Sequence, residues 1–364
     1  MIYNESDFDD AHDEMSSDKD VGLWNVYFLS LRNPREPAHD FGLVKVGFTK
    51  KDVEKRIEQL QTGNPYQIVC EDRFSAPAFV ARQVEHWIHR TNASSIEKLE
   101  WLRLRRSEIA AFVELAKQQA ERLADIAAAK ARWSQSESNG KERPPEPAEL
   151  RLHADAQGVN AELRHLKLQL RQIRARLALT AGKVYHIPGI VRISLFPQLA
   201  VFDSETAFKL FRPLASQFIV EKVRGEFHWR NRARRSMETG RLQREVDSLV
   251  EQRKHLDAAM LATPSEVRDQ GERTTDLAQL HGIFLDLLQK EMRLKVDLED
   301  IEARVIQRME DAKAIVNVCS YPRSLESYLD VKSLKALHRS AYDQCKSITR
   351  AASVHRMIYK SLSY

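Results

Sequence analysis

The sequence predicts an α+β protein, in which a small N-terminal α/β domain would precede a long helical body. Two short runs rich in β-branched and aromatic residues, VYFLSL (26–31) and LVKVGF (43–48), predict neighbouring strands near the N-terminus. Farther along, apolar residues that recur every three or four positions predict long coiled-coil helices. The β-rich segment GKVYHIPGIVRISLF (182–196) interrupts these helices and predicts a small α/β insert.

Composition and charge limit the classes of protein to consider. The chain has 364 residues, enough for two or three domains, and 43% of them are apolar, which suffices for folded cores. The formal net charge is +5, but residues 1–20 hold eight acidic side chains and one lysine, so subtracting −7 leaves about +12 on the rest. A basic body behind an acidic arm favours a nucleic-acid partner, and an ordinary solvated surface is the plain alternative.

Cysteine usage and hydropathy favour a cytoplasmic protein. The three cysteines, Cys70, Cys319 and Cys345, are far apart and match no zinc or redox spacing. A reducing compartment is the simplest setting for such a set. No stretch approaches the roughly 20 apolar residues that span a bilayer, and the acidic N-terminus does not resemble a signal peptide, so we expect no membrane partner.

Changes in composition along the chain predict six segments. A Pro-rich stretch at 134–148 breaks the first pair of long helices, and YPRS (321–324) ends the last long helix. The predicted segments are an acidic arm at 1–20, a small α/β domain at 21–115, long helices at 116–181, an α/β insert at 182–230, coiled-coil helices at 231–320 and C-terminal helices at 321–364.

The N-terminal domain shows alternating strand and helix signals. After the two strands comes KDVEKRIEQLQT (51–62), a helix with Asp52 at its N-terminus and GNP (63–65) as its stop. YQIVCEDRFS (66–75) predicts a third strand, and FVARQVEHWIHRT (79–91) predicts a second helix.

The long helices carry apolar seams that step alternately by four and three residues, the spacing of a coiled coil. These seams admit two readings: helices that pair within one chain, or a homodimer. Polar residues interrupt the last seam at Glu291 and Arg308, and each should either find a partner or reach solvent, because a buried unpaired charge is costly. The seam positions are Val159, Leu163, Leu166, Leu170, Ile173 and Leu177; Leu242, Val246, Leu249, Arg253, Leu256 and Met260; and Leu277, Leu280, Phe284, Leu287, Glu291, Leu294, Leu298, Ile301, Val305 and Arg308.

Three motifs in the N-terminal domain resemble a known family in combination. They are VKVGFTKKDVEKRIEQLQTGNP (44–65), VEHWIH (84–89) and LEWLRL (99–104). In this order, after a strand with a tyrosine, they resemble the GIY-YIG endonuclease superfamily, and more narrowly its phage-type branch, in which a lysine stands where other members have the second tyrosine. The resemblance covers about residues 22–115. It implies a GIY-YIG-like fold for this domain and a metal-dependent DNA endonuclease in a phage, prophage or defence setting.

The resemblance implies a catalytic role for five residues. Tyr27 would orient or deprotonate the attacking water, and Lys45, on the neighbouring strand, would face it and supply a cation that favours the ionised phenol. Arg56 offers a planar guanidinium to the phosphate as its charge builds. Glu85 would be the single carboxylate that holds Mg²⁺ or Mn²⁺, with His89 one helical turn away to contact phosphate or support the metal.

The sequence departs from the family pattern at two places. The first motif reads NVY (25–27) and lacks the glycine of the family's first motif. Many members also have a supporting asparagine downstream of the glutamate. Asn92 follows Glu85 by only seven residues, so we do not assign it that role. These departures leave room for a domain that binds without cutting.

Two clusters of arginines are candidates for binding the DNA backbone. One follows the predicted second helix in WLRLRRSE (101–108), and the other lies in VRGEFHWRNRARRSMETGRLQR (223–244), beside aromatic residues suited to base stacking. The alternative for the second cluster is a basic helix start that pairs with an acidic helix. The candidate residues are Arg103, Arg105, Arg106, Arg230, Arg232, Arg234 and Arg235.

The leading hypothesis is therefore a DNA endonuclease that requires a divalent metal. The second is a nucleic-acid-binding or scaffolding protein whose nuclease-like domain no longer cuts. A third is a coiled-coil assembly protein in which the domain docks other proteins. Tyr27, Arg56 and Glu85 discriminate between them, because binding alone does not need all three.

Overall fold

The structure is a computed structural model, and it contains an α+β fold, as predicted. It describes residues 22–36, 41–62, 64–92, 96–98, 101–196, 199–231, 237–350 and 353–359. The predicted acidic arm at 1–20 lies outside these residues. The chain divides into two compact units. The first unit runs to Ser134 and also includes Val296–Asp311, and the second unit comprises Gln135–Lys295 and Ala312–Tyr364.

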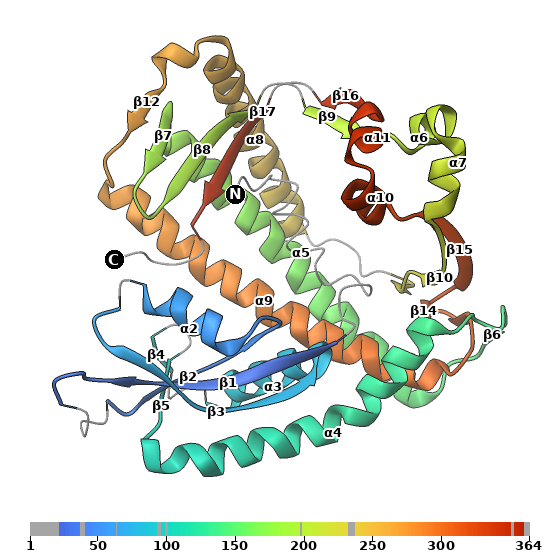
Figure 1. The fold of residues 1–364 in the computed structure, drawn as a ribbon. Helices are drawn as coiled ribbons and strands as arrows, with labels where there is room; N and C mark the ends of the chain where they lie inside the picture. Colours follow the sequence, from blue (N-terminus) through green and yellow to red (C-terminus); the bar gives the residue numbers. More distant parts are fainter. Residues whose placement is uncertain are drawn as a thin grey trace. The chain divides into compact units, whose positions relative to one another are not determined.

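A five-stranded antiparallel sheet forms the centre of the first unit. Its strand order is β3-β1-β2-β5-β4, so that the first two strands lie next to each other in the middle (Figure 1). The register of β1 on β3 shifts between Phe28 and Leu29, where a bulge interrupts the pairing. The strands are β1 (Leu23–Arg32), β2 (Leu43–Thr49), β3 (Gln67–Pro77), β4 (Ile96–Lys98) and β5 (Trp101–Arg103).

Helices cover the two faces of this sheet differently. Alternate residues of β1 and β2, including Val26 and Val46, pack against α3 (Ala78–Thr91) and α4 (Ile109–Gln135). On the other face, Tyr27 and Leu29 form a smaller cluster with α2 (Val53–Gln61). Figure 1 shows α2 and α3 on opposite sides of the strands. A short turn, η2 (Arg106–Glu108), leads into α4.

The first unit extends beyond the domain that the sequence predicted at 21–115. It includes most of α4 and the C-terminal part of α9 (Thr275–Met309). Ala303 of α9 is fully buried in the same apolar cluster as Val84 and Ile88 of α3. No sequence pattern within residues 21–115 indicates that this helix belongs to the unit, because the helix comes from a distant part of the chain.

The second unit is built on a four-stranded sheet and three long helices. The sheet has the order β12-β7-β8-β17, and apolar residues of α5, α8 and the N-terminal part of α9 share one core with it. Helix α5 packs along α8. The elements are α5 (Pro147–Ala181), α8 (Met237–Ala262), β7 (Val184–Ile187), β8 (Val191–Phe196), η4 (Pro264–Glu266), β12 (Arg268–Gln270) and β17 (Ser353–Ile358).

Three smaller sheets complete the described part of the second unit. Four very short strands form one of them, and two strand pairs, β10–β15 and β16–β9, form the others. Their strands are β6 (Glu142–Arg143), β9 (Leu199–Phe202), β10 (Ile219–Gly225), β11 (His228–Trp229), β13 (Ala314–Ile315), β14 (Cys319–Ser320), β15 (Arg323–Leu329) and β16 (Lys346–Arg350). The short helices beside them are α6 (Ser204–Leu210), α7 (Arg212–Ala215), η3 (Ser216–Phe218), α10 (Val331–Leu337) and α11 (Arg339–Gln344).

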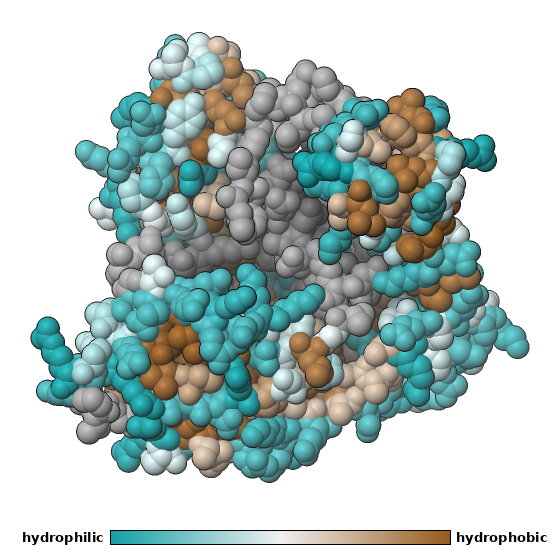
Figure 2. Space-filling view, viewed as in Figure 1, coloured by the Kyte–Doolittle hydropathy of each residue, from teal (hydrophilic) through white to brown (hydrophobic). Residues whose placement is uncertain are grey.

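The prediction of helices alone at 321–364 is wrong. This segment contains α10 and α11, but also β15, β16 and β17, which pair with strands of the predicted 182–230 insert. The insert and the C-terminal segment therefore fold together. Around α6, α7, α10 and α11 the surface shows hydrophobic patches (Figure 2). Leu210 of α6 and Leu337 of α10 are exposed.

The predicted seams are partly buried, and the chain's own elements bury them. Leu170 and Ile173 of α5 share a core with Met260 of α8 and Phe284 of α9. In the C-terminal part of α9 the buried face matches the predicted seam only in part. Val305 is buried as predicted, but Glu299, Ala303, Ile306 and Met309 are buried as well, while Arg308 is exposed. The two polar interruptions behave as expected, because Glu291 pairs with Lys295 at 3.0 Å and Arg308 faces solvent.

Candidate active site

Tyr27 lies against the backbone of Gly47 on the central strand pair. The two residues are direct partners across the antiparallel β1–β2 ladder. A Cβ atom built on Gly47 would come 2.5 Å from the Tyr27 hydroxyl oxygen and 2.7 Å from its Cζ, closer than real side-chain contacts allow. The phenol therefore occupies the space that any other residue at position 47 would need. This explains in physical terms why the KVG motif has a glycine at that place.

Lys45 shares a sheet face with Tyr27 but does not stand directly opposite it. Its direct partner on β1 is Leu29, so Lys45 and Tyr27 are diagonal neighbours. The expectation that the two side chains face each other directly is therefore wrong, because each has a different residue as its direct partner. Both are buried, with exposed fractions of 2% for Tyr27 and 7% for Lys45.

Arg56 is carried by α2, which covers the same face. The helix begins as the sequence predicted: the Asp52 carboxylate accepts a hydrogen bond from the Glu54 backbone N–H at 3.3 Å. Val53 and Ile57 of α2 pack on the cluster that contains Tyr27. Arg56 itself is half-buried, and its guanidinium donates to the Gln59 side chain at 3.3 Å.

Glu85 and His89 lie on α3, which packs on the opposite face of the sheet. They are one helical turn apart and both are half-buried. The structure therefore places Glu85 and His89 on the helix that covers one face of the sheet, and Tyr27, Lys45 and Arg56 on or over the other face.

The described residues contain no cluster of three or more His, Cys, Asp or Glu side chains that could hold a metal ion. A single carboxylate such as that of Glu85 would be enough for a hydrated Mg²⁺, which binds through one or two protein carboxylates and keeps several waters. Asn92, which the sequence left without a role, has a structural one: its amide donates to the Ile88 carbonyl at 2.9 Å at the end of α3.

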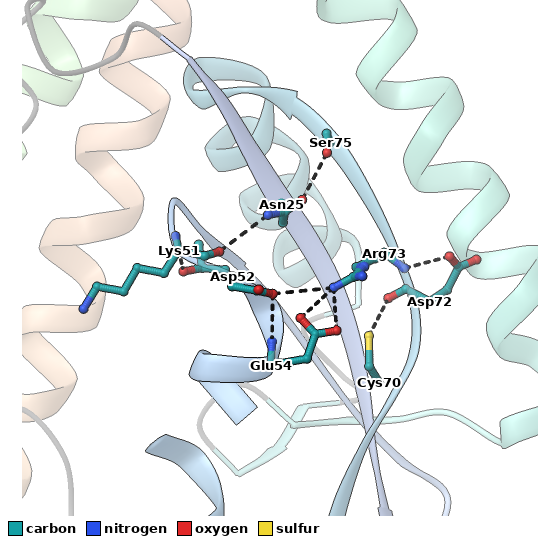
Figure 3. Close-up of polar contacts among 9 residues, drawn as sticks. Asn25, Lys51, Asp52, Glu54, Cys70, Asp72, Arg73 and Ser75 are labelled. Carbon is teal, nitrogen blue, oxygen red and sulfur yellow. Dashed lines mark hydrogen bonds and ion pairs between the residues drawn. The ribbon is translucent and has the colours of Figure 1, made fainter. Parts of the chain in front are cut away.

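Sequence reasoning missed a charged cluster beside Tyr27. Arg73 of β3 is the partner of Tyr27 on the other side of β1. Its Nη1 donates to both carboxylate oxygens of Glu54, at 2.8 and 2.9 Å, and lies 3.9 Å from the Asp52 carboxylate. Figure 3 shows Arg73 reaching from β3 across β1 to the start of α2. The hydrogen bonds to Glu54 raise the pKa of Arg73 above its ordinary value.

The predicted DNA-binding arginines among the described residues are divided between the two units. Arg103 and Arg105 are exposed in the first unit, and Arg106 lies 3.5 Å from the Glu71 carboxylate. Arg230 belongs to the second unit, where its guanidinium is 3.0 Å from Glu142. Glu142 belongs to β6 and not to a helix, so this ion pair is not the pairing with an acidic helix that the alternative expects. The remaining candidates, Arg232, Arg234 and Arg235, lie outside the described residues.

A buried ion network fixes α3 against α4 and α9 within the first unit. Arg82 of α3 binds Glu299 of α9 with two hydrogen bonds, at 2.6 and 3.1 Å, and Lys130 of α4 reaches the same carboxylate at 2.9 Å. His86 contacts Asp297 at 2.9 Å. Burial opposes the charged form of Glu299, but Lys130 and Arg82 outweigh this and hold its pKa below the ordinary value.

Comparison with known proteins adds no identity to this geometry. No helix among the described residues is both long and apolar enough to cross a membrane. The chain matches no family model, no curated protein and no solved structure, so the resemblance read from its motifs stands on those motifs alone.

Proposed function

We propose that this chain is a GIY-YIG-type DNA endonuclease that hydrolyses phosphodiester bonds with the help of Mg²⁺ or Mn²⁺. The observation that carries the proposal is the packing of Tyr27 on Gly47, with Lys45 on the same face. Motif residues from two separate strands thus share one place in the fold. Helix α2, which presents Arg56, covers the same face.

The residue types suit this chemistry. A water oxygen forms a new bond to phosphorus while the bond to the leaving oxygen breaks, and the water's proton passes to a base. Tyr27 would orient the water or take its proton as the base, with the Lys45 cation on the same face of the sheet. Arg56 would bind the non-bridging phosphate oxygens as their charge grows. Glu85 would hold the divalent ion, which supplies positive charge to the phosphate and the leaving oxygen.

The deciding experiment is plasmid cleavage. Supercoiled plasmid is incubated with the protein and Mg²⁺ or Mn²⁺, and the parent is compared with Glu85→Ala. We expect nicked or linear product with the parent and none with the variant, while DNA binding stays nearly unchanged because many cations contribute to it. Glu114→Ala, which removes an exposed carboxylate from α4, is the matched control. Equal activity of Glu85→Ala and the parent would end the hypothesis.

A second candidate is a domain that binds nucleic acid or a protein without cutting. The burial of Tyr27 and Lys45 favours it, because a general base and its supporting cation must reach water and substrate. A parent protein that binds duplex DNA but leaves plasmid intact with both metals would support this reading over the first.

The coiled-coil body and the homodimer remain proposals. The packing of α5 along α8 supports helix pairing within one chain, which is one of the two readings of the seams. Gln172 and Arg176 of α5 both contact the Glu245 carboxylate of α8 at 2.6 Å, so polar contacts flank this pair. A dimer would place two catalytic domains on one particle and let it cut both strands in one encounter.

A further inference from the structure

The Arg73–Glu54 ion pair lies on the face of the sheet that carries Tyr27. Arg73 is bonded to Glu54 at 2.8 and 2.9 Å and is the β3 partner of Tyr27. Its side chain crosses the face of β1 that carries Tyr27 (Figure 3). The pair and the start of α2 therefore lie on the same side of the sheet as Tyr27.

The pair is exposed, so its partners can exchange. The side chain of Arg73 is 47% exposed and that of Glu54 is 60% exposed. Exposed ion pairs are screened by water and salt, and either partner regains hydration when they separate. A guanidinium also binds a phosphate with the same two-pronged geometry that it uses for a carboxylate. A backbone phosphate can thus take the place of the Glu54 carboxylate.

Another ion pair on the same sheet shows why this one is suited to exchange. Arg32 and Glu71 approach to 3.2 Å, but the Glu71 side chain is only 13% exposed and also accepts a hydrogen bond from Ser30. Separating that pair would leave a mostly buried carboxylate with one cation fewer to offset the free-energy cost of its desolvation. Glu54 has no such constraint, because water can solvate its carboxylate as soon as Arg73 leaves.

We propose that Arg73 binds a backbone phosphate of DNA next to the scissile bond, and that Glu54 holds Arg73 in the DNA-free protein. The phosphate then takes the place of the Glu54 carboxylate on the Arg73 guanidinium. This inference rests on the proposed DNA substrate and deepens it.

Binding to a short fluorescent duplex, measured by anisotropy in EDTA over a series of salt concentrations, tests the exchange without any cleavage. Arg73→Ala should weaken binding and reduce the slope of log K against log salt by about one, as expected for one lost phosphate contact. Glu54→Gln should tighten binding severalfold, because it removes the competitor of the phosphate. The double variant should bind like Arg73→Ala alone.

A charge-matched control separates exchange from general electrostatics. Glu58→Gln removes one negative charge from an exposed position of the same helix, α2, and should change binding much less than Glu54→Gln. If Glu54→Gln tightens binding equally when Arg73 is already alanine, or if Glu58→Gln matches it, the exchange is refuted. Arg73→Lys should recover only part of the affinity, and thermal unfolding verifies that each variant folds.

The two proposals can fail separately. A parent that binds duplex DNA with the predicted Glu54–Arg73 coupling but cuts nothing refutes the nuclease and keeps the exchange. A parent that cuts plasmid while Arg73→Ala retains full binding and cleavage refutes the exchange and keeps the nuclease. A further measurement adds inorganic phosphate at matched ionic strength to the duplex-binding assay. Strong competition between inorganic phosphate and the duplex would show a site for free phosphate rather than for DNA.

Discussion

The hydroxyl of Tyr27 rests on the backbone of Gly47, 2.5 Å from where a Cβ atom of that residue would stand. Tyr27 is 2% exposed, so it has little room to move aside. Gly47→Ala should therefore displace the phenol and lower the free energy of unfolding by about 1–3 kcal/mol, the usual cost of overpacking. Cleavage should fall more steeply than stability, because the displaced group is the proposed base. Thermal melts and plasmid assays measure the two effects.

Gly158→Ala is the control for that variant. Gly158 lies in α5, and no other atom lies within 4 Å of the point that an added Cβ would occupy. Alanine there should leave cleavage unchanged and stabilise the helix by roughly 0.4–1 kcal/mol. A Gly47→Ala protein that cuts plasmid normally would show that the position of the phenol does not matter.

Arg56→Lys should damage cleavage nearly as much as Arg56→Ala. A lysine keeps the charge but loses the planar fork that binds two phosphate oxygens at once. Lys55→Ala, a change of the exposed neighbouring cation, should have a small effect that fades at higher salt. Turnover on plasmid at saturating DNA measures all three. Recovery of most activity by lysine would reduce Arg56 to a general electrostatic contact.

Glu299→Gln should destabilise the first unit strongly. Its carboxylate neutralises Arg82 and Lys130 in a buried site, and removing one partner of such a network typically costs about 3–5 kcal/mol. Glu121→Gln, on an exposed face of α4, is the control and should change the melting temperature little.

The same carboxylate predicts how stability depends on pH. The pKa of Glu299 is lower in the folded protein than its ordinary value of 4.5, so the unfolded chain binds the proton more readily. The stabilising contribution of the ionised Glu299 carboxylate is therefore complete above about pH 4.5. It is lost as the pH falls through the lower pKa that Glu299 has in the folded protein. Melting temperatures between about pH 7 and pH 3 should fall more steeply for the parent than for Glu299→Gln. Parallel curves would contradict the prediction.

The mass in solution decides between the two readings of the helical seams. Light scattering should give about twice 42.0 kDa for the predicted homodimer and 42.0 kDa for a chain whose helices pair only internally. A monomer would also weaken the model of simultaneous cutting, because a single Tyr27–Glu85 site would have to serve both DNA strands in turn.

Local patterns in the sequence predicted the parts of the fold that depend on local physics. β1, β2, β3, α2 and α3 lie within a few residues of their expected bounds, and Asp52 caps α2 as expected. Alternating apolar residues and helix caps act over a few positions, so one sequence suffices to detect them.

Features set by distant pairing could not be read in the same way. The C-terminal strand RSLESYL (323–329) pairs with β10, about a hundred residues earlier, and its polar composition gives little strand signal. The bulge between Phe28 and Leu29 sets which residue of β3 faces Tyr27, so Arg73 could not be placed beside it. The Arg82–Glu299 pair joins residues 217 positions apart, and no local pattern marks either one.

The place of α9 in the first unit has a consequence for how the protein is made. The strands and helices around Tyr27 leave the ribosome early, yet the helix that supplies Glu299 and Ala303 is complete only roughly 175 residues after Ser134. At ordinary rates of synthesis that delay is on the order of ten to thirty seconds. During this time Arg82 lacks its carboxylate partner and the apolar cluster that contains α3 lacks Ala303. A nascent chain would therefore depend on chaperones at this stage, and a gene fragment ending at residue 115 should yield an aggregating product rather than a portable nuclease.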